Sequence, residues 1–283
     1  MAEHPHLKAS ELFTCKGFTA VVTGGGTGIG LMQTLALVEN GAKVFIVSRN
    51  EEKLRDVAQK YGGKGSDGRG EIIPVPGIVT TKADLSKIVV ESRNKRQTAF
   101  TSCSTTQEWP ERGLGKVQGA AEEWARILNV NVIGYYFTAA AFLPLLQKGG
   151  KSTKGYASQI INVSSISGLM KGSSGGQYAN AASKEAIVQL SKVMAREFLP
   201  LKIRVNQIAP GIFPSEMTAG DSDPNTHKSS IEGKGQGLPS GRPGDEKDMA
   251  AATLYLASHT GVFTNGQILH PDGGATVQTP SSL

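Results

Sequence analysis

The chain has 283 residues, of which 39% are hydrophobic, and this is enough to bury the core of one α/β domain. Its two cysteines are too few for a disulfide framework and its five histidines are scattered, so we expect no metal site. The net charge of +6 is dispersed apart from one short run at 93–96, which argues against a nucleic-acid surface.

The N-terminal stretch 1–13 contains acidic residues and no apolar core, so it is typical neither of a signal peptide nor of a transit peptide. No window approaches the roughly 20 apolar residues that a membrane span needs. We therefore expect a cytoplasmic protein, a single domain over 1–283, that binds neither a membrane nor nucleic acid.

Residues 18–50 predict a strand, a glycine turn, a helix and a second strand. The first strand, at 18–22, is a short β-branched apolar run, and apolar residues recur at helical spacing over 31–38. The second strand covers 44–47. We interpret this stretch as a βαβ unit.

The turn between that strand and helix has the spacing Gly-x-x-x-Gly-x-Gly. Such a turn needs residues that accept positive φ, and it lets a pyrophosphate approach the backbone and the start of the next helix. Glycine turns are common, but this position between a strand and a helix favours nucleotide binding over a plain turn. The candidate nucleotide-binding residues are Gly24, Thr27, Gly28, Ile29 and Gly30.

The end of the second strand indicates which dinucleotide is bound. An acidic side chain there would bond the ribose hydroxyls of NAD, whereas this chain has Ser48, Arg49 and Asn50. Arginine pairs well with a 2′-phosphate, so we expect NADP as the cofactor. The alternative is that Arg49 is only a solvated residue.

The later elements continue to alternate. Strands are expected at 71–75, 159–165, 203–209 and 266–270, and helices at 121–146, 178–198 and 248–258. This alternation predicts a doubly wound, Rossmann-like parallel sheet with helices on both faces. Ligands then bind outside the carboxyl ends of the strands.

Several motifs occur in an order that resembles one family. They are TGGGTGIG (23–30), NVNV (129–132), NVSSISG (162–168), ASK (182–184), NQIAPGIFPSEMT (206–218) and PDGG (271–274). Together they resemble the short-chain dehydrogenase/reductase family, particularly its fungal-looking members, over about residues 10–278. The resemblance implies NADP-dependent hydride transfer between nicotinamide and a ketone or secondary alcohol, and a homodimer or homotetramer.

In this family a tyrosine gives its proton to the carbonyl oxygen, a lysine lowers the pKa of the phenol and holds the ribose, a serine orients the carbonyl, and an asparagine supports a proton-relay water. A phenol with a pKa of about 10 needs such positive charge nearby to act at neutral pH. The matching positions are Ser165, Asn131 and Lys184. Without the resemblance, Ser165 would be interpreted as a strand-end hydroxyl and Asn131 as a helix-kink residue. The remaining cofactor contacts implied are Val79, Lys184, Pro210, Gly211 and Ile212.

The tyrosine position is the first departure from the family pattern. The family places its tyrosine one helical turn before the lysine, and counting back from Lys184 that residue is Asn180. Asparagine has no titratable proton, and losing a general acid costs on the order of a hundred- to ten-thousand-fold in rate. Tyr178 could substitute only if the helix began later, with this residue in the preceding loop. The alternatives are therefore an active enzyme and a catalytically impaired nucleotide-binding protein.

The second departure lies in the turn within 74–85. Many family members have an aspartate there, just before a valine, that accepts from the adenine amino group, but this chain has Ile78. Asp84 belongs to a sequence that looks like a helix start. We expect the adenine pocket to have lost a polar contact.

The third departure lies at 98–113, where the family has a central strand followed by an Asn-Asn-Ala-Gly turn. The sequence there predicts no buried strand, yet a shifted reading frame over Cys103–Trp109 permits the missing turn. We hypothesise that roughly 91–119 is an out-of-frame translation and expect it to be the least ordered part of the chain. A divergent insertion is the alternative.

The segment after the APG motif is rich in glycine, serine and charge, and it indicates a mobile substrate lid at about 212–240. Neither the substrate nor the direction of the reaction follows from the sequence.

Overall fold

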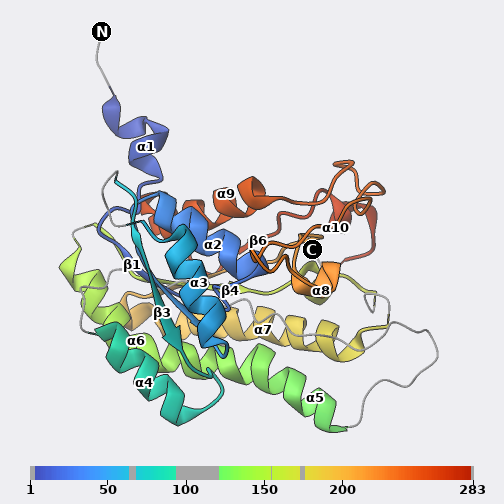
Figure 1. Cartoon of the computed structure of the whole chain (residues 1–283), viewed down its shortest axis with the longest axis horizontal. Helices are drawn as coiled ribbons and strands as arrows, with labels where there is room; N and C mark the ends of the chain where they lie inside the picture. The colour runs from blue at the N-terminus through green and yellow to red at the C-terminus, as the bar shows by residue number, and fades with distance from the viewer. Residues whose placement is uncertain (1–3, 64–67, 94–120, 154, 173–175, 282–283) are drawn as a thin grey trace.

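The computed structural model describes residues 4–63, 68–93, 121–153, 155–172 and 176–281. Within these residues, two three-stranded parallel sheets have the strand orders β1-β2-β3 and β4-β5-β6. Figure 1 shows the strands in the middle of the molecule with helices on either side. The strands are β1 Thr19–Thr23, β2 Lys43–Ser48, β3 Glu71–Pro76, β4 Gln159–Val163, β5 Arg204–Ile208 and β6 Ile268–Leu269. The predicted α/β fold with parallel strands is confirmed.

Neighbouring strands begin at matching positions. Thr19 of β1 lies opposite Lys43 of β2, and Gln159 of β4 lies opposite Arg204 of β5. Parallel neighbours need a crossover connection, and each of these connections contains a helix. The carboxyl ends of β1 and β2 therefore share one edge of the first sheet, and those of β4 and β5 share one edge of the second.

Of the helices expected over 31–38, 121–146, 178–198 and 248–258, all but one agree with the observed bounds to within about one turn. The described residues form seven longer helices. They are α2 Gly28–Glu39, α3 Glu51–Tyr61, α4 Lys82–Arg93, α5 Ala121–Leu128, α6 Gly134–Ser152, α7 Tyr178–Glu197 and α9 Glu246–Ala257. The shorter helices are α1 Ala9–Leu12, α8 Glu216–Ala219 and α10 Ala275–Gln278.

The exception is the helix expected over 121–146. α5 ends at Leu128, a π-helical turn follows over Asn129–Ile133, and only then does α6 begin. A π turn inserts one extra residue into a helix, and such turns are frequent at functional sites. The apolar pattern continues on both sides of the insertion, so the sequence predicted one unbroken helix.

The stretch Ala121–Ser152 is also long and apolar enough to cross a membrane, by length and composition. The expectation that no window is so apolar is thereby corrected. α6 packs on β4 and α4 in this fold, and it buries Phe142, Leu145 and Leu146 in the core. A core helix of a globular protein has the same composition, so the stretch does not favour a membrane span.

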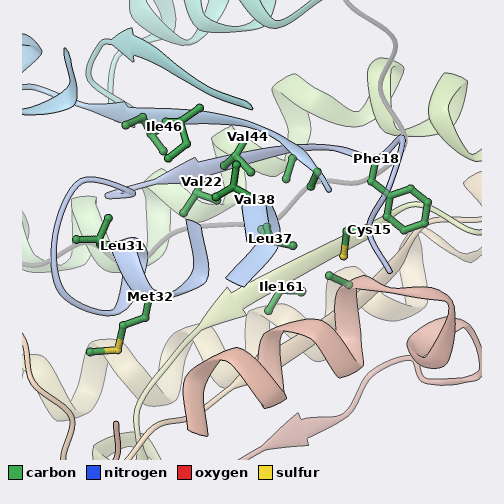
Figure 2. Packing of buried hydrophobic residues seen from close by; sticks show 14 of the residues in the cluster. Cys15, Phe18, Val22, Leu31, Met32, Leu37, Val38, Val44, Ile46 and Ile161 are labelled. Atoms are coloured by element: carbon green, nitrogen blue, oxygen red, sulfur yellow. The ribbon is translucent and has the colours of Figure 1, made fainter. Parts of the chain in front are cut away.

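The core has two layers because helices cover both faces of the sheets. In β2, Val44 and Ile46 pack with residues of α2, α3 and α9, whereas Phe45 and Val47 pack with residues of α4, α6 and α7. Figure 2 shows the first of these layers close up, with Val22 and Val38 beside Val44. Burial on both faces explains why the middles of β1 and β2 are continuous apolar runs rather than alternating ones.

The third predicted departure falls outside the described residues. Both the missing central strand at 98–113 and nearly all of the proposed out-of-frame stretch 91–119 lie there. Residues 91–93 are described, and they end α4. The order expected of this stretch and its origin stay predictions.

Candidate active site

The glycine turn follows β1 and leads into α2. Gly24 and Gly28 have φ of 68° and 51°, in the left-handed region that favours glycine. The Gly24 amide donates to the Val47 carbonyl at 2.7 Å, which ties the turn to the end of β2. α2 begins at Gly28 with Thr27 as its N-cap residue, so backbone amides are directed at the space beyond the turn. This arrangement could hold a phosphate.

Gly25 explains why the turn is so tight. A Cβ added there would lie 2.7 Å from Ile46 Cγ2 and 2.9 Å from the Val22 carbonyl oxygen. The Thr34 hydroxyl, from the second turn of α2, donates to the Gly25 carbonyl at 3.2 Å. Strand, turn and helix are therefore locked together in the form that a close approach of a dinucleotide requires.

The three residues expected to bind the nucleotide at the end of β2 lie in different environments. The Asn50 side chain accepts from the Lys53 amide at 2.9 Å, and it thereby caps α3. Ser48 is half-buried and donates to the Asn50 carbonyl at 3.4 Å. Arg49 is exposed and has no ion-pair partner among the described residues. Of the three, Arg49 is the side chain best placed to meet an anion.

The turn after β3 contains the second departure. Ile78 is 39% exposed, and its amide donates to the Asp84 carboxylate at 3.2 Å. Asp84 lies in the first turn of α4, as its sequence predicted, so the carboxylate supports the turn backbone. Val79 is half-buried, with Cγ2 3.7 Å from where a Cβ on Gly134 would lie, at the start of α6.

Asn131 is buried inside the π-helical turn. Its Nδ2 donates to the Ser183 hydroxyl at 3.0 Å, and that hydroxyl donates to the Asn180 carbonyl at 2.7 Å. The inserted residue of the π turn therefore brings Asn131 against the first turns of α7. Ser183 was not predicted as a site residue, and its only signal in the sequence is its place directly before the lysine.

Ser165 lies just after β4, where the chain leaves the sheet. Its hydroxyl donates to Ser167 Oγ at 3.1 Å and accepts from the Ser167 amide, so it caps the 3-10 helix Ile166–Gly168. That helix packs against α7 so closely that a Cβ on Gly168 would lie 2.5 Å from the Lys184 carbonyl carbon. Gly168 was also not predicted, and its absent side chain is what brings the Ser165 turn to Lys184.

Lys184 and Asn180 lie on one face of α7, one turn apart, and both are buried. Asn180 is 2% exposed; its Nδ2 donates to Gln177 Oε1 at 3.4 Å, while its Oδ1 is buried without a hydrogen-bond partner in the described structure. The position one turn before the lysine is thus an interior position filled by an amide.

Tyr178 is the first residue of α7 and is 59% exposed. Tyr178 could take the role of the family's tyrosine only if the helix began after it. α7 instead begins at Tyr178, with Gln177 as the N-cap residue. The structure therefore does not bring Tyr178 to the face that carries Asn180 and Lys184.

The turn after β5 carries the last expected contacts. The Gly211 amide donates to the Pro271 carbonyl at 3.1 Å, and a Cβ on Gly211 would lie 2.7 Å from Asp272 Cα. The Pro210 carbonyl accepts from the Ile166 amide at 3.2 Å, which joins this turn to the one that contains Ser165. Ile212 follows and is half-buried.

Asp272 holds the neighbouring loop in place. Its carboxylate accepts from the Gly274 amide at 2.9 Å and from the amide and hydroxyl of Thr276 at 2.8 and 2.6 Å. Burial raises the pKa of this carboxyl, but the bonds from Thr276 and Gly274 outweigh it, so the pKa lies below its ordinary value of 3.8. Asp272 therefore stays ionised and fixes the loop that supports Gly211.

Comparison with known proteins agrees with this geometry. The family model described as short chain dehydrogenase matches residues 18–226. Short-chain dehydrogenase/reductase PhomF of Diaporthe leptostromiformis is 39% identical over 296 residues, covering 98% of both chains. A rhamnolipids biosynthesis 3-oxoacyl-(acyl-carrier-protein) reductase of Pseudomonas aeruginosa is 31% identical over 270 residues, covering 93% of this chain and 97% of its own.

A solved structure gives the same result. The Pseudomonas aeruginosa RhlG/NADP active-site complex is 30% identical and superposes with a TM-score of 0.79, covering 93% of this chain and 98% of that one. Sequence and fold agree over almost the whole chain. The protein therefore belongs to the short-chain dehydrogenase/reductase family.

Proposed function

We propose that this protein is an NADP-dependent oxidoreductase that acts on a small ketone or secondary alcohol. The observation that carries the proposal is the packing of Gly168 on Lys184, because it brings the Ser165 turn and the lysine together at the carboxyl end of β4. Membership of an oxidoreductase family supports the reaction class.

The nucleotide side of the site fits a dinucleotide. Gly24 and Gly28 have positive φ, and the start of α2 offers free amides for a pyrophosphate. Arg49 supports NADP over NAD because it is exposed, has no ion-pair partner among the described residues and matches the geometry of a phosphate. The relative from Pseudomonas aeruginosa was solved as an NADP complex, which is a second support. The cofactor supplies the hydride when it is bound.

The catalytic side orients a carbonyl group better than it protonates one. In this proposal the Ser165 hydroxyl donates to the substrate oxygen, and Lys184 holds the ribose and adds positive charge nearby. The Asn180 amide can donate a hydrogen bond, but it has no proton to give up. The final proton must therefore come from water, and we propose that turnover is slow.

Asn180 also favours a second candidate, a nucleotide-binding protein without turnover. The relatives named above are described as a dehydrogenase/reductase and a reductase, so the comparisons lend this candidate no support. The two candidates share the nucleotide site and differ only in whether substrate is consumed.

A titration followed by a turnover assay tests the proposal. We expect the quenching of protein fluorescence to report binding of NADPH at lower concentration than NADH. A panel of small ketones should then give slow oxidation of bound NADPH, above the rate without ketone. A correctly folded protein, checked by circular dichroism, that binds neither nucleotide would overturn the proposal. Binding with no ketone-dependent oxidation would favour the second candidate.

A further inference from the structure

The predicted lid segment is strapped to the side of α3. We call residues 215–231 the strap. It contacts α3 from the first turn of that helix to the last, through residues that lie more than 160 positions apart in sequence. The contacts are Glu216 to Lys53, His227 to Asp56, the Asn225 carbonyl to Lys60 and the Thr226 carbonyl to Tyr61.

Two of these contacts join side chain to side chain. Glu216 Oε1 lies 2.9 Å from Lys53 Nζ, and His227 Nε2 lies 2.6 Å from Asp56 Oδ2. His227 is 6% exposed and has φ of 54°, so the strap backbone turns sharply to bury it. The strap is therefore anchored at two points that are one turn apart on α3.

The Lys53–Glu216 pair joins two helices that follow strands of different sheets. Lys53 lies in the first turn of α3, just after β2, and Glu216 begins α8, after β5. The pair also lies against the glycine turn, because a Cβ on Gly26 would be 4.0 Å from Lys53 Cγ and 3.4 Å from Leu54 Cδ2. Lys53 thus lies beside the glycine turn and four residues after Arg49, which the proposed function assigns to the pyrophosphate and the 2′-phosphate.

Glu216 is charged at neutral pH. Burial raises its pKa, but hydrogen bonds from Lys53 and from Ser222, the latter at 2.8 Å, together with the charges of Lys53 and His227, bring it below its ordinary value of 4.5. The ammonium of Lys53 is therefore neutralised by a carboxylate from the strap. Lys53 is therefore a second cation beside the glycine turn, four residues after Arg49, and it is already paired with Glu216.

We propose that Glu216 sets the nucleotide preference by competing with the 2′-phosphate for Lys53. When NADP enters, the Lys53 ammonium exchanges the carboxylate for the phosphate, since both are anions that one ammonium can pair with. NAD lacks that phosphate and leaves the Lys53–Glu216 pair closed. Glu216 is thus a positioning residue that acts through Lys53, and the inference rests on the proposed function for the place of the dinucleotide.

Glu216→Gln is the direct test, because it removes the competing charge and keeps the shape. We expect the ratio of NADPH affinity to NADH affinity to rise about two- to fivefold, the range of a partly exposed ion pair. Glu232→Gln is the matched control, since Glu232 is in the same loop, is exposed and has no ion pair among the described residues. It makes the same change in net charge and should leave the ratio unchanged.

Lys53→Met supplies the second half of a double-mutant cycle. In the Lys53→Met background, Glu216→Gln should no longer raise the ratio, because the residue for which the two anions compete is gone. Equal changes for NADPH and NADH in Glu216→Gln, or a gain that persists without Lys53, would overturn the inference. Failure of the parent to bind either nucleotide would instead count against the proposed function, so the two failures are distinguishable.

Discussion

The regions around the two sheets differ in how well their residues match the roles that we propose for them. Around β1 and β2, the glycine turn and Arg49 are in place, and Gly25 locks strand to helix. Around β4 and α7, the supporting contacts are equally tight, but the residue one turn before Lys184 is Asn180. The position is still buried, and Gln177 still bonds its amide. In our proposal, position 180 lacks the reactive group of the family, while the packing is tight in both regions.

The largest expected effect comes from restoring a phenol to the second region. Asn180→Tyr should raise ketone reduction about 100- to 10,000-fold, the usual contribution of a general acid. The new phenol would lie on the Lys184 face of α7, where the ammonium favours its ionised form. The rate of NADPH oxidation at saturating ketone is the measurement, made on protein that is shown to bind NADPH.

Tyr178→Phe is the matched control for that variant. Tyr178 is 59% exposed at the start of α7, so loss of its hydroxyl should change the rate little. If this variant instead abolished a measurable activity of the parent, then Tyr178 would be the acid and the assignment of Asn180 to the tyrosine position would be wrong.

The first region should respond to charge. Arg49→Asp should reverse the order of affinity for NADPH and NADH, with a change in their ratio of about 10- to 100-fold, because a charge-assisted bond to phosphate is replaced by repulsion. Fluorescence titration of both nucleotides measures it. Equal affinities in the parent protein would remove the basis for expecting NADP.

The packing that aims the catalytic side can be tested at two glycines. A Cβ on Gly168 would lie 2.5 Å from backbone atoms of Lys184, whereas one on Gly172 would meet nothing within 4 Å. Gly168→Ala should lower the free energy of unfolding by about 1–3 kcal/mol, as overpacking does. Gly172→Ala should stay within about 0.5 kcal/mol of the parent. Urea denaturation compares them, and equal stabilities would contradict the close approach of the Ser165 turn to α7.

The smallest expected effect concerns the loop that supports Gly211. The pKa of Asp272 is lowered in the folded state, so its contribution to stability is present above the unfolded value of 3.8 and is lost as the pH falls through the folded value. Asp272→Asn should therefore cost about 1 kcal/mol at neutral pH. The difference from the parent should shrink below pH 3.8, and urea titrations at several pH values would show it. A constant difference would mean that the charge of Asp272 is unimportant.

Much of the fold could be predicted because its signals are local. The β-branched run at 18–22, the glycine spacing after it and the helical periodicity over 31–38 each lie within a few residues, and the structure has the corresponding strand, turn and helix. The same holds for α7, whose predicted start at 178 agrees with the structure.

The rest of the fold and the site could not be predicted, because it depends on contacts between residues that are far apart in the sequence. The bond from Asn131 to Ser183 joins residues 52 apart, and the pair of Lys53 and Glu216 joins residues 163 apart. The lid at 212–240 was predicted from composition alone, and composition does not show that His227 is buried against α3. The absent side chain of Gly168 matters only because α7 packs on it.

The π-helical turn over Asn129–Ile133 has a consequence for how this gene can change length. The turn sets the rotation between α5 and α6, and deleting one residue would rotate α6 by about 100° relative to α5. Tyr135, Phe142 and Leu145, which face the core, would then swing toward solvent, while Asn131 would leave Ser183. A substitution in this turn changes one side chain and leaves this rotation in place, whereas a single-codon deletion would damage core and site together.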